Sequence, residues 1–337
     1  MRTKHIVVVG ASAGGIEALR ELVAGLTEDF PAPICVVLHT SPQAPGVLDS
    51  ILSRAGKLPA RNARDRERLQ PRRIYVAPPD CHLLVEPGIV RVTKGPRENR
   101  FRPAIDPLFR SAAQVYGPAA IGVVLTGNLD DGTAGLWAIK QLGGIAVVQD
   151  PADALFPSMP HSALHNVRAD HVAPLSGIPS LLIRLTTEVA EPAEPEPVEL
   201  VVPPTVEVEV KIAKEENPLQ AGLQGITEPS AFACPECHGV LLRLKEGGPV
   251  RFRCHTGHAY SLDSLLAGVS EGIEEAMWNA IRALEEGEML LRAMAEHATA
   301  HSASEAATLI GRAEEAKKHS DELRKLIMAR EPLTADR

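Results

Sequence analysis

The stretch Ile6–Gly15 constrains the fold of this chain more than any other. A β-branched run, Ile6–Val9, breaks into small residues, and a helical pattern follows over Ile16–Leu26. A short Val/Ile-rich run predicts a strand buried in a parallel sheet, and the glycines permit a sharp turn into a helix. Ser12 lies at the apex of this turn in Gly-x-Ser-x-Gly spacing. The spacing suits an exposed nucleophile, and equally a phosphate held by backbone N–H groups at a helix N-terminus.

Composition and charge exclude several classes of protein. The chain has 337 residues, enough for two domains, and its net charge of −8 disfavours nucleic-acid binding, which requires clustered Lys and Arg. It has no apolar run of the roughly 18 residues that a membrane span needs, and its N-terminus shows no signal peptide. The five cysteines do not form a disulfide framework. We therefore expect a soluble, cytoplasmic protein that neither binds nucleic acid nor inserts into a membrane.

Strand and helix patterns alternate through residues 1–190. The predicted strands after the first are Ile34–Leu38, Ile74–Ala77, Ala120–Leu125 and Ile145–Gln149, with a hairpin of His82–Val85 and Ile89–Val92. The predicted helices are Val47–Ala55, Pro107–Tyr116, Thr133–Leu142, Pro160–Val167 and Pro179–Leu185. Such alternation predicts an α/β fold, a doubly wound, mostly parallel sheet with helices on both faces.

Three polar positions follow strands of this sheet. Ser12 follows the first strand, His39 the second, and Asp130–Asp131 the strand Ala120–Leu125. Because the carboxyl ends of parallel strands share one edge, these side chains are candidate neighbours. A serine nucleophile needs a base, and a carboxylate can fix the tautomer of a histidine base. Each residue also has a simpler interpretation, as a helix N-cap, a backbone-bonded histidine or a turn aspartate.

The motifs of this region resemble those of the chemotaxis protein-glutamate methylesterases (CheB type) over about residues 4–185. The matching segments are Gly10–Gly15, Val37–His39, Tyr75–Pro78, Asn99–Asp106, Gly122–Gly127, Asp131–Gly135 and Met159–Pro160. The resemblance implies that Ser12 is the nucleophile, His39 the general base and Asp131 its orienting carboxylate. The family hydrolyses methyl esters on glutamates of chemoreceptor cytoplasmic helices and often deamidates glutamines there. It also implies a stand-alone form, since no phosphoacceptor receiver domain precedes the esterase segment.

Further site residues follow from the same resemblance. The backbone N–H groups of Ala13 and Asn128 are candidates for the oxyanion hole, and Leu129 replaces a glycine that is usual in the family. Three side chains match positions near the family's cleft and are candidate substrate contacts: Arg100, Arg102 and His82. Arginine suits acidic receptor segments. A structural arginine that pairs with Asp106 or with the backbone is the alternative.

Residues 191–228 form a predicted linker. Pro and Glu dominate its first part, a composition typical of a stiff, extended spacer. The alternation over Val206–Ile212 also fits an edge strand.

Residues 229–260 carry a metal-ligand pattern. Cys234 and Cys237 form a Cys-x₂-Cys pair, and Cys254 and His258 follow after sixteen intervening residues. This spacing predicts a zinc-ribbon-like Cys₃His site for one structural Zn²⁺, with a hairpin between the two pairs. His238 and His255 are alternative ligands, and reduced cysteines without metal are the other interpretation.

Residues 261–330 form a predicted helical hairpin. Ser261 can cap a helix that reaches about His297, and Ser302 with Glu305 forms a capping box for a second helix. Internal packing of the two helices is the default role of their apolar stripe, while a signalling partner or self-association is the alternative.

Taken together, these patterns predict a serine methylesterase that needs no catalytic cofactor. The alternatives are a non-catalytic signalling adaptor that acts through its tail, and a nucleotide-binding α/β protein, although no Lys follows the Gly-rich turn as in a P-loop. Because the first domain has its own core, we expect its esterase activity to be independent of the metal.

Overall fold

The computed structural model describes residues 5–187, 201–245, 248–298 and 302–333. Within these residues the main sheet has seven parallel strands in the order β3-β4-β2-β1-β7-β8-β9. The strands are β1 (Ile6–Ala11), β2 (Ile34–Leu38), β3 (Ala60–Asn62), β4 (Ile74–Val76), β7 (Ala120–Val124), β8 (Ile145–Gln149) and β9 (His171–Ala173). The predicted α/β fold with a mostly parallel sheet is confirmed.

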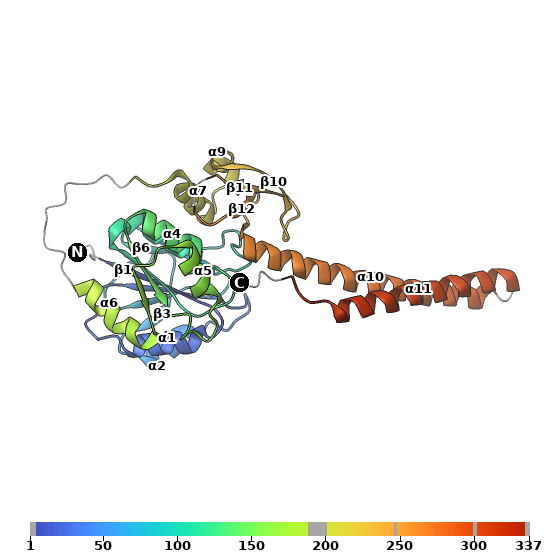
Figure 1. The fold of residues 1–337 in the computed structure, drawn as a ribbon, viewed down its shortest axis with the longest axis horizontal. Coiled ribbons are helices and arrows are strands. Elements are labelled where there is room, and N and C mark those ends of the chain that lie inside the picture. Colours follow the sequence, from blue (N-terminus) through green and yellow to red (C-terminus); the bar gives the residue numbers. More distant parts are fainter. Residues whose placement is uncertain (1–4, 188–200, 246–247, 299–301, 334–337) are drawn as a thin grey trace. The chain divides into compact units, whose positions relative to one another are not determined.

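Helices cover both faces of this sheet (Figure 1). One face packs against α1 (Gly15–Ala24), α2 (Leu48–Ala55) and α6 (Ile178–Thr187). The other packs against α3 (Ile105–Tyr116), α4 (Thr133–Gln141) and α5 (Ser158–Asn166). Alternate residues of β1 point to opposite faces of the sheet. Val7 and Val9 pack into the core beneath α1, α2 and α6, and Ile6 and Val8 pack into the core beneath α3, α4 and α5. This explains why the strand is apolar without alternation.

The order of the strands reverses direction at β1. β1 pairs with β2 on one side and with β7 on the other, with Gly10 opposite both Val37 and Val124. In open parallel sheets, ligand sites form at such a reversal, beyond the carboxyl ends of the strands. The segments after β1, β2 and β7 therefore meet at one edge.

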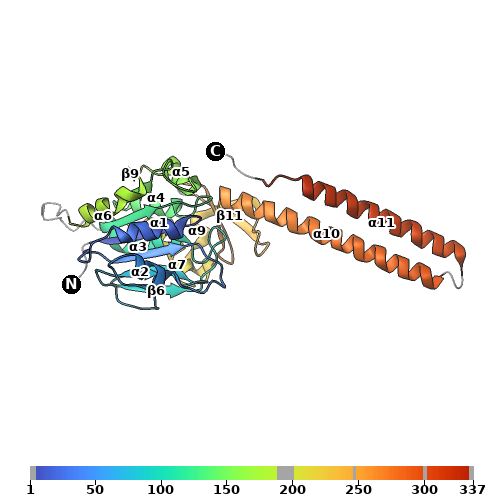
Figure 2. The ribbon, with the colours of Figure 1, turned by 90° about the horizontal axis from the view of Figure 1, so that it is seen from below.

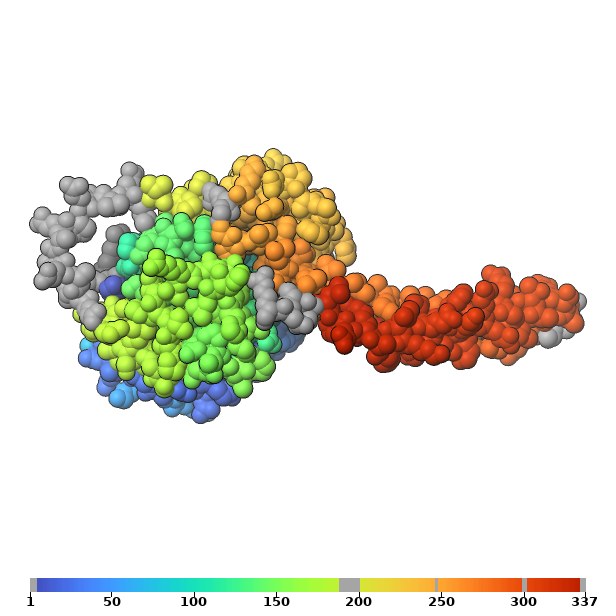
Figure 3. Space-filling model, viewed as in Figure 1, coloured from blue at the N-terminus to red at the C-terminus, as the bar shows by residue number. Residues whose placement is uncertain are grey.

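Two antiparallel sheets accompany the main one. β5 (His82–Glu86) and β6 (Ile89–Thr93) form the predicted hairpin, with His82 opposite Thr93. A second sheet contains β10 (Thr227–Ala233), β11 (Val240–Leu244), β12 (Arg251–Cys254) and β13 (Ala259–Ser261) in that order. We call residues 227–264 the cysteine-rich module. It belongs to the same compact unit as the main sheet, residues 1–264, and not to a separate domain as the sequence predicted. In the space-filling view its yellow to light-orange surface adjoins the green surface of the α/β layers (Figure 3).

The predicted spacer is wrong for its second half. Residues 204–226 form α7 (Pro204–Ala213), α8 (Pro218–Ala221) and α9 (Leu223–Ile226), while residues 188–200 of the predicted linker lie outside the described residues. Pro204 takes the first helical position of α7, where its missing N–H has no cost. Val206 and Val210 pack into the core beside α3, and Glu209 is buried as well. The Val/Glu alternation resembles a strand because this helix is buried on more than one face.

A cluster of buried charges surrounds Glu209. Arg253 Nη2 lies 2.9 Å from both Glu209 Oε1 and Glu98 Oε1. Arg251 Nη1 lies 2.5 Å from Glu209 Oε2, and Arg110 pairs with Glu98. Burial alone would raise the pKa of Glu209, but the three arginines outweigh burial and hold that pKa well below its usual range. The cluster joins α3, α7, β12 and the loop before α3.

A second compact unit begins at Leu265, and its described helices form a hairpin. α10 (Leu262–Ala298) and α11 (Ala303–Ala329) run antiparallel (Figure 2). The side chain of Ser302 accepts a hydrogen bond from the backbone N–H of Glu305, and Ser320 Oγ donates to Glu285 Oε1 at 3.2 Å across the hairpin. No described helix is long and apolar enough to cross a membrane.

We expect Glu209→Ala to lower the free energy of unfolding by about 3–5 kcal/mol, because it leaves buried arginines without a carboxylate. Urea denaturation of the full chain measures this change. The matched control is Glu207→Ala on the same helix, whose exposed ion pair with Lys211 at 2.7 Å is screened by solvent and contributes little to stability. Equal, small losses in both variants would show that the buried cluster does not depend on Glu209.

Candidate active site

Ser12 sits in a tight turn directly after β1. Its N–H donates to Thr126 O at 3.0 Å, and Gly15 N–H donates back to Ser12 O at 2.9 Å. Gly14 has φ 72°, a conformation that glycine adopts without strain. A Cβ at Gly15 would lie 2.6 Å from the Leu38 side chain. The glycines therefore let the chain reverse beside β2 and present the serine.

Gly127 gives Ser12 its space. A Cβ at Gly127 would lie 2.8 Å from Ser12 Cβ and 2.1 Å from Met159 Sδ. No larger residue fits at this point without displacing the serine. The glycine at the end of the Leu-Thr-Gly segment after β7 is thus explained by its close approach to the turn.

Ser12, His39 and Asp131 form one hydrogen-bonded line. His39 Nδ1 lies 3.1 Å from Ser12 Oγ, and His39 Nε2 lies 2.6 Å from Asp131 Oδ2. The side chains of His39 and Asp131 are only 3% and 2% exposed. Phe101 stacks on the imidazole with ring centroids 3.7 Å apart and an interplanar angle of 9°. The stacking of Phe101 restrains the tilt of the His39 ring, and the two hydrogen bonds restrain its rotation within the ring plane.

Asp131 is a buried carboxylate with many donors. The nitrogens that donate to Oδ2 or Oδ1 are His39 Nε2, Ile105 N at 2.6 Å, Asn99 Nδ2 at 2.9 Å, Gly132 N at 3.0 Å and Asp106 N at 3.3 Å. Burial by itself would raise the pKa of Asp131. The hydrogen bond and charge of His39, with the other donors, outweigh burial and lower that pKa below its usual value. The group is anionic at neutral pH.

The residues Glu98–Phe101 form a tight turn that touches both partners. Glu98 and Phe101 exchange backbone hydrogen bonds of 3.2 and 2.9 Å, and Asn99 and Arg100 have φ 49° and 75°. Positive φ at both central residues defines a type I′ turn, in which asparagine is favoured. Asn99 bonds Asp131 and Phe101 stacks on His39. The sequence motif included these residues, but nothing in it assigned them these contacts; the one available signal was asparagine, which tolerates this backbone.

Of the two arginine candidates, Arg102 is occupied. Its Nε and Nη2 donate to Asp80 Oδ1 at 3.0 and 2.7 Å, and its Nη1 donates to Gly95 O at 3.0 Å. It is the structural arginine of the alternative interpretation, although its partner is Asp80 and not Asp106. Arg100 is half-buried in the turn beside Phe101.

His82 is fully buried within the hairpin β5–β6. Its Nε2 lies 2.9 Å from Pro96 O, and its Nδ1 accepts from Ala104 N–H at 3.2 Å. Burial lowers the pKa of His82. Both ring nitrogens are used, so the side chain has no polar atom left for a substrate.

Ala13 follows Ser12 within the serine turn, and Asn128 follows Gly127, which approaches Ser12 closely. Among the described residues, neither backbone N–H donates to another group of the protein. Leu129, next to Asn128, has φ 60°. A left-handed conformation at this position explains why the family commonly has glycine there, and the fold accommodates leucine in it at some cost.

The four predicted metal ligands converge in the cysteine-rich module. One ligand atom from each of Cys234, Cys237, Cys254 and His258 lies within 4.8 Å of all the others. His258 Nδ1 is 3.7 Å from Cys234 Sγ and 3.6 Å from Cys254 Sγ. Tetrahedral Zn²⁺ with bonds of about 2.0–2.3 Å requires ligand separations of roughly 3.5–3.8 Å, so the donor set fits. His238 and His255, the alternative ligands, are exposed and do not belong to the cluster.

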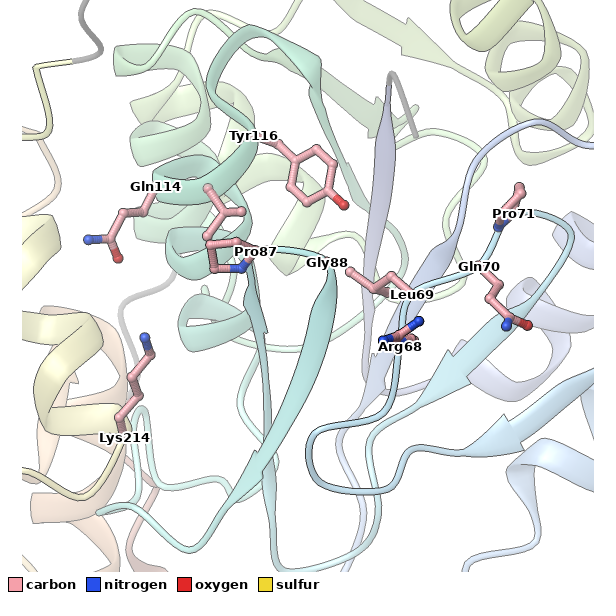
Figure 4. Close-up of a pocket in the computed structure, with 10 residues that line it drawn as sticks. Arg68, Leu69, Gln70, Pro71, Pro87, Gly88, Gln114, Tyr116 and Lys214 are labelled. Carbon is pink, nitrogen blue, oxygen red and sulfur yellow. The ribbon is translucent and has the colours of Figure 1, made fainter. Parts of the chain in front are cut away.

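A cavity of about 870 Å³ lies away from these groups (Figure 4). Pro87 and Gly88 of the β5–β6 turn, Gln114 and Tyr116 near the end of α3, and Lys214 line it. None of Ser12, His39 and Asp131 borders it. We assign it no part in the site.

A serine, a histidine and an aspartate hydrogen-bonded in line at the carboxyl edge of a doubly wound sheet are typical of serine hydrolases. The CheB methylesterase family model matches residues 7–182. The chain belongs to the CheB methylesterase family, a family of carboxylic ester hydrolases.

Relatives and a solved structure support this assignment. A Leptospira interrogans protein is 41% identical over 180 residues, which cover 53% of this chain and 93% of that protein. Protein-glutamate methylesterase/protein-glutamine glutaminase 2 of Anaeromyxobacter dehalogenans is 40% identical over 182 residues, and these cover 54% of this chain but only 53% of that protein. The crystal structure of the Thermotoga maritima CheB methylesterase catalytic domain is 36% identical, with a TM-score of 0.52, and covers 54% of this chain and 98% of that one.

Asp130, which precedes Asp131, has a different environment. Its Oδ1 accepts a hydrogen bond of 2.7 Å from Ser261 Oγ. Burial and the neighbouring charges of Asp263, Asp106 and Asp131 raise the pKa of Asp130 to about 7, against the hydrogen bond from Ser261, which lowers it. The raised pKa means that the native state binds a proton more tightly than the unfolded chain does.

Because ionising Asp130 is unfavourable in the native state, its contribution to stability is full below about pH 4 and is lost as the pH rises through about 7. Asp130→Asn removes this dependence. We expect the variant to gain about 1–3 kcal/mol relative to wild type between pH 5 and pH 8. Urea unfolding at several pH values measures the difference, and a constant difference across this range would contradict the raised pKa.

Proposed function

We propose that this protein is a serine esterase that hydrolyses glutamate methyl esters on chemoreceptor-type cytoplasmic helices and can deamidate glutamine there. Ser12 is the nucleophile, His39 the general base and Asp131 the carboxylate that orients it. The continuous contact from Ser12 Oγ through both nitrogens of His39 to Asp131 Oδ2 is the observation that supports this function best.

The hydrogen bonds favour one tautomer of His39. An anionic Asp131 accepts a hydrogen bond from Nε2–H, and the lone pair of Nδ1 is then directed at Ser12 Oγ. His39 can therefore take the serine proton while Asp131 stabilises the imidazolium. Phe101, stacked on the ring, resists its rotation away from the serine.

The reaction then follows the serine-hydrolase sequence. Ser12 Oγ attacks the γ-carbonyl carbon of the methylated glutamate, and the N–H groups of Ala13 and Asn128 stabilise the oxyanion. His39 returns its proton to the leaving methoxide, which departs as methanol. A water molecule, deprotonated by His39, attacks the acyl-enzyme. The bond to Ser12 Oγ breaks, His39 returns the proton to Ser12 Oγ, and the glutamate is released.

Arg100 is a candidate substrate contact, because it lies next to Phe101, which stacks on His39. A guanidinium there matches the acidic character of a glutamate-rich receptor segment. The proposed substrate places the protein in the cytoplasm. The α10–α11 hairpin is a candidate surface for a signalling partner or for self-association.

We also propose that Cys234, Cys237, Cys254 and His258 hold one structural Zn²⁺. The four ligand atoms converge, and Glu236 Oε2 lies 3.4 Å from His258 Nε2, where a carboxylate orients a metal-binding histidine. A closed set of four protein ligands supplies folding energy to the module and takes no part in the reaction.

Ser12→Ala should lower methanol release from a methylated receptor fragment by at least about 10³-fold, because it removes the nucleophile and alanine fits the turn. Methanol release from the purified full chain measures this. The control is Ser50→Ala, which removes an exposed hydroxyl on α2. Near-wild-type turnover of Ser12→Ala would contradict the mechanism, while an inactive wild type with an intact fold would favour the adaptor.

Elemental analysis of protein purified without chelator should find about one zinc per chain. Cys237→Ser should lose most of it, because a tetrahedral site loses one of its four ligands. Cys81→Ser, a cysteine outside the cluster, should keep it. Absence of zinc from the wild-type protein would contradict the metal site.

A further inference from the structure

We propose that the cysteine-rich module completes the active site through Asn99, which is a positioning residue for Asp131. The proposal builds on the esterase function above and deepens it. It assigns a catalytic support role to residues 227–264, which lie beyond the segment matched by the family model.

The side-chain amide of Asn99 bridges the module and the triad. Its Nδ2 donates to Asp131 Oδ1 at 2.9 Å and to Asp106 Oδ2 at 3.0 Å. Its Oδ1 accepts from Ser261 N at 3.0 Å and from Ser264 Oγ at 3.1 Å. The two donors of the module therefore decide which end of the amide faces the carboxylates. If the amide turned over, a carbonyl oxygen would face Asp131 and repel it.

The backbone of the same turn is attached to the module. Asn99 N–H donates to Ala259 O at 2.8 Å, and Ala259 N–H donates to Arg97 O at 3.2 Å. Arg253 of β12 holds Glu98, the first residue of the turn, at 2.9 Å. These contacts come from two adjacent strands of the module, β12 and β13.

These contacts stabilise a backbone conformation of Asn99 and Arg100 that is unfavourable by itself. Asn99 and Arg100 both have positive φ, which costs free energy in residues other than glycine and persists where surrounding contacts over-determine it. On its opposite side the turn carries Phe101, stacked on His39. Movement of this one turn would therefore disturb both Asp131 and His39.

The candidate zinc ligands connect the two strands that hold the turn. Cys254 is the last residue of β12, and His258 directly precedes β13, with Cys254 N–H donating to His258 O at 3.0 Å. A change in the conformation of the loop 254–258 would therefore displace the turn Glu98–Phe101. This proposal differs from the sequence-based expectation that the esterase activity is independent of the metal.

The test uses full-length Asn99→Gly, Ser264→Ala and the double variant. Glycine keeps the positive φ of the turn and removes the amide. We expect Asn99→Gly to lower kcat about 10- to 100-fold with KM changed less than about 3-fold, because misplacing a catalytic group affects the chemical step. Ser264→Ala should lower kcat about 3- to 10-fold, and the double variant should match Asn99→Gly, since both changes break one bridge.

Ser230→Ala is the matched control. Its hydroxyl also belongs to the module but donates to Leu241 O at 2.6 Å, with no contact to the turn. We expect its kcat to stay at the wild-type value. Additive losses in the double variant, or a wild-type kcat for Asn99→Gly, would overturn the proposal.

A second readout separates this proposal from the proposed function. The rate at which a phosphonofluoridate labels Ser12, followed by mass spectrometry, reports the triad without any methyl ester. Slower labelling of Asn99→Gly supports positioning even if the wild type releases no methanol, an outcome that would reject only the substrate. Labelling at the wild-type rate overturns positioning. Should Asn99→Gly fail to fold, Asn99→Asp keeps the shape of the side chain and removes the donor to Asp131.

Discussion

The buried ion cluster around Glu98 and Glu209 is the interaction on which the rest of the proposed site depends. Two carboxylates and the arginines of α3 and β12 share an interior from which water is excluded. Removing one partner from such a cluster leaves a buried charge unpaired, which is costly. The cluster therefore holds α7, β12 and the turn Glu98–Phe101 against α3. Because these elements share the same charged groups, displacement of one would disturb the others.

The turn Glu98–Phe101 connects the ion cluster to the proposed site, because Glu98 belongs to both the cluster and the turn. From the loop before α3 it reaches Asp131 with an amide and His39 with an aromatic ring. At the serine, the missing side chains of Gly127 and Gly15 let the Ser12 turn pack closely against the segment after β7 and against Leu38 of β2. The serine is thus placed by the sheet and its glycines, whereas the histidine and the aspartate are placed by the sheet and the module.

The segment that matches the CheB methylesterase family, residues 7–182, contains the α/β layers and ends within α6. The cysteine-rich module lies outside this segment. Its contacts to Asn99 and Asp130 nevertheless reach the residues next to and within the candidate triad. We therefore interpret the cysteine-rich module as a structural part of the active site and not as a separate C-terminal domain.

The resemblance to the CheB family selects Asp131 over Asp130 as the candidate carboxylate. Patterns in the sequence predict the parallel sheet, its order of elements, the hairpin β5–β6, the set of four metal-ligand residues and the candidates Ser12, His39 and Asp130–Asp131. These features depend on local patterns: buried β-branched runs, glycine turns and fixed ligand spacings. The sequence does not predict the edge strands β3 and β9, because they are polar and only partly buried, whereas β4, of the same length, is a buried apolar run. The three-dimensional contacts show three further features: residues 204–213 are helical, Arg102 and His82 bond to structural partners, and Asn99 joins the module to Asp131. Each of these depends on a partner far away in the chain, such as Arg253 for Glu209 or Ser261 for Asn99, and no local pattern of residues identifies such a partner.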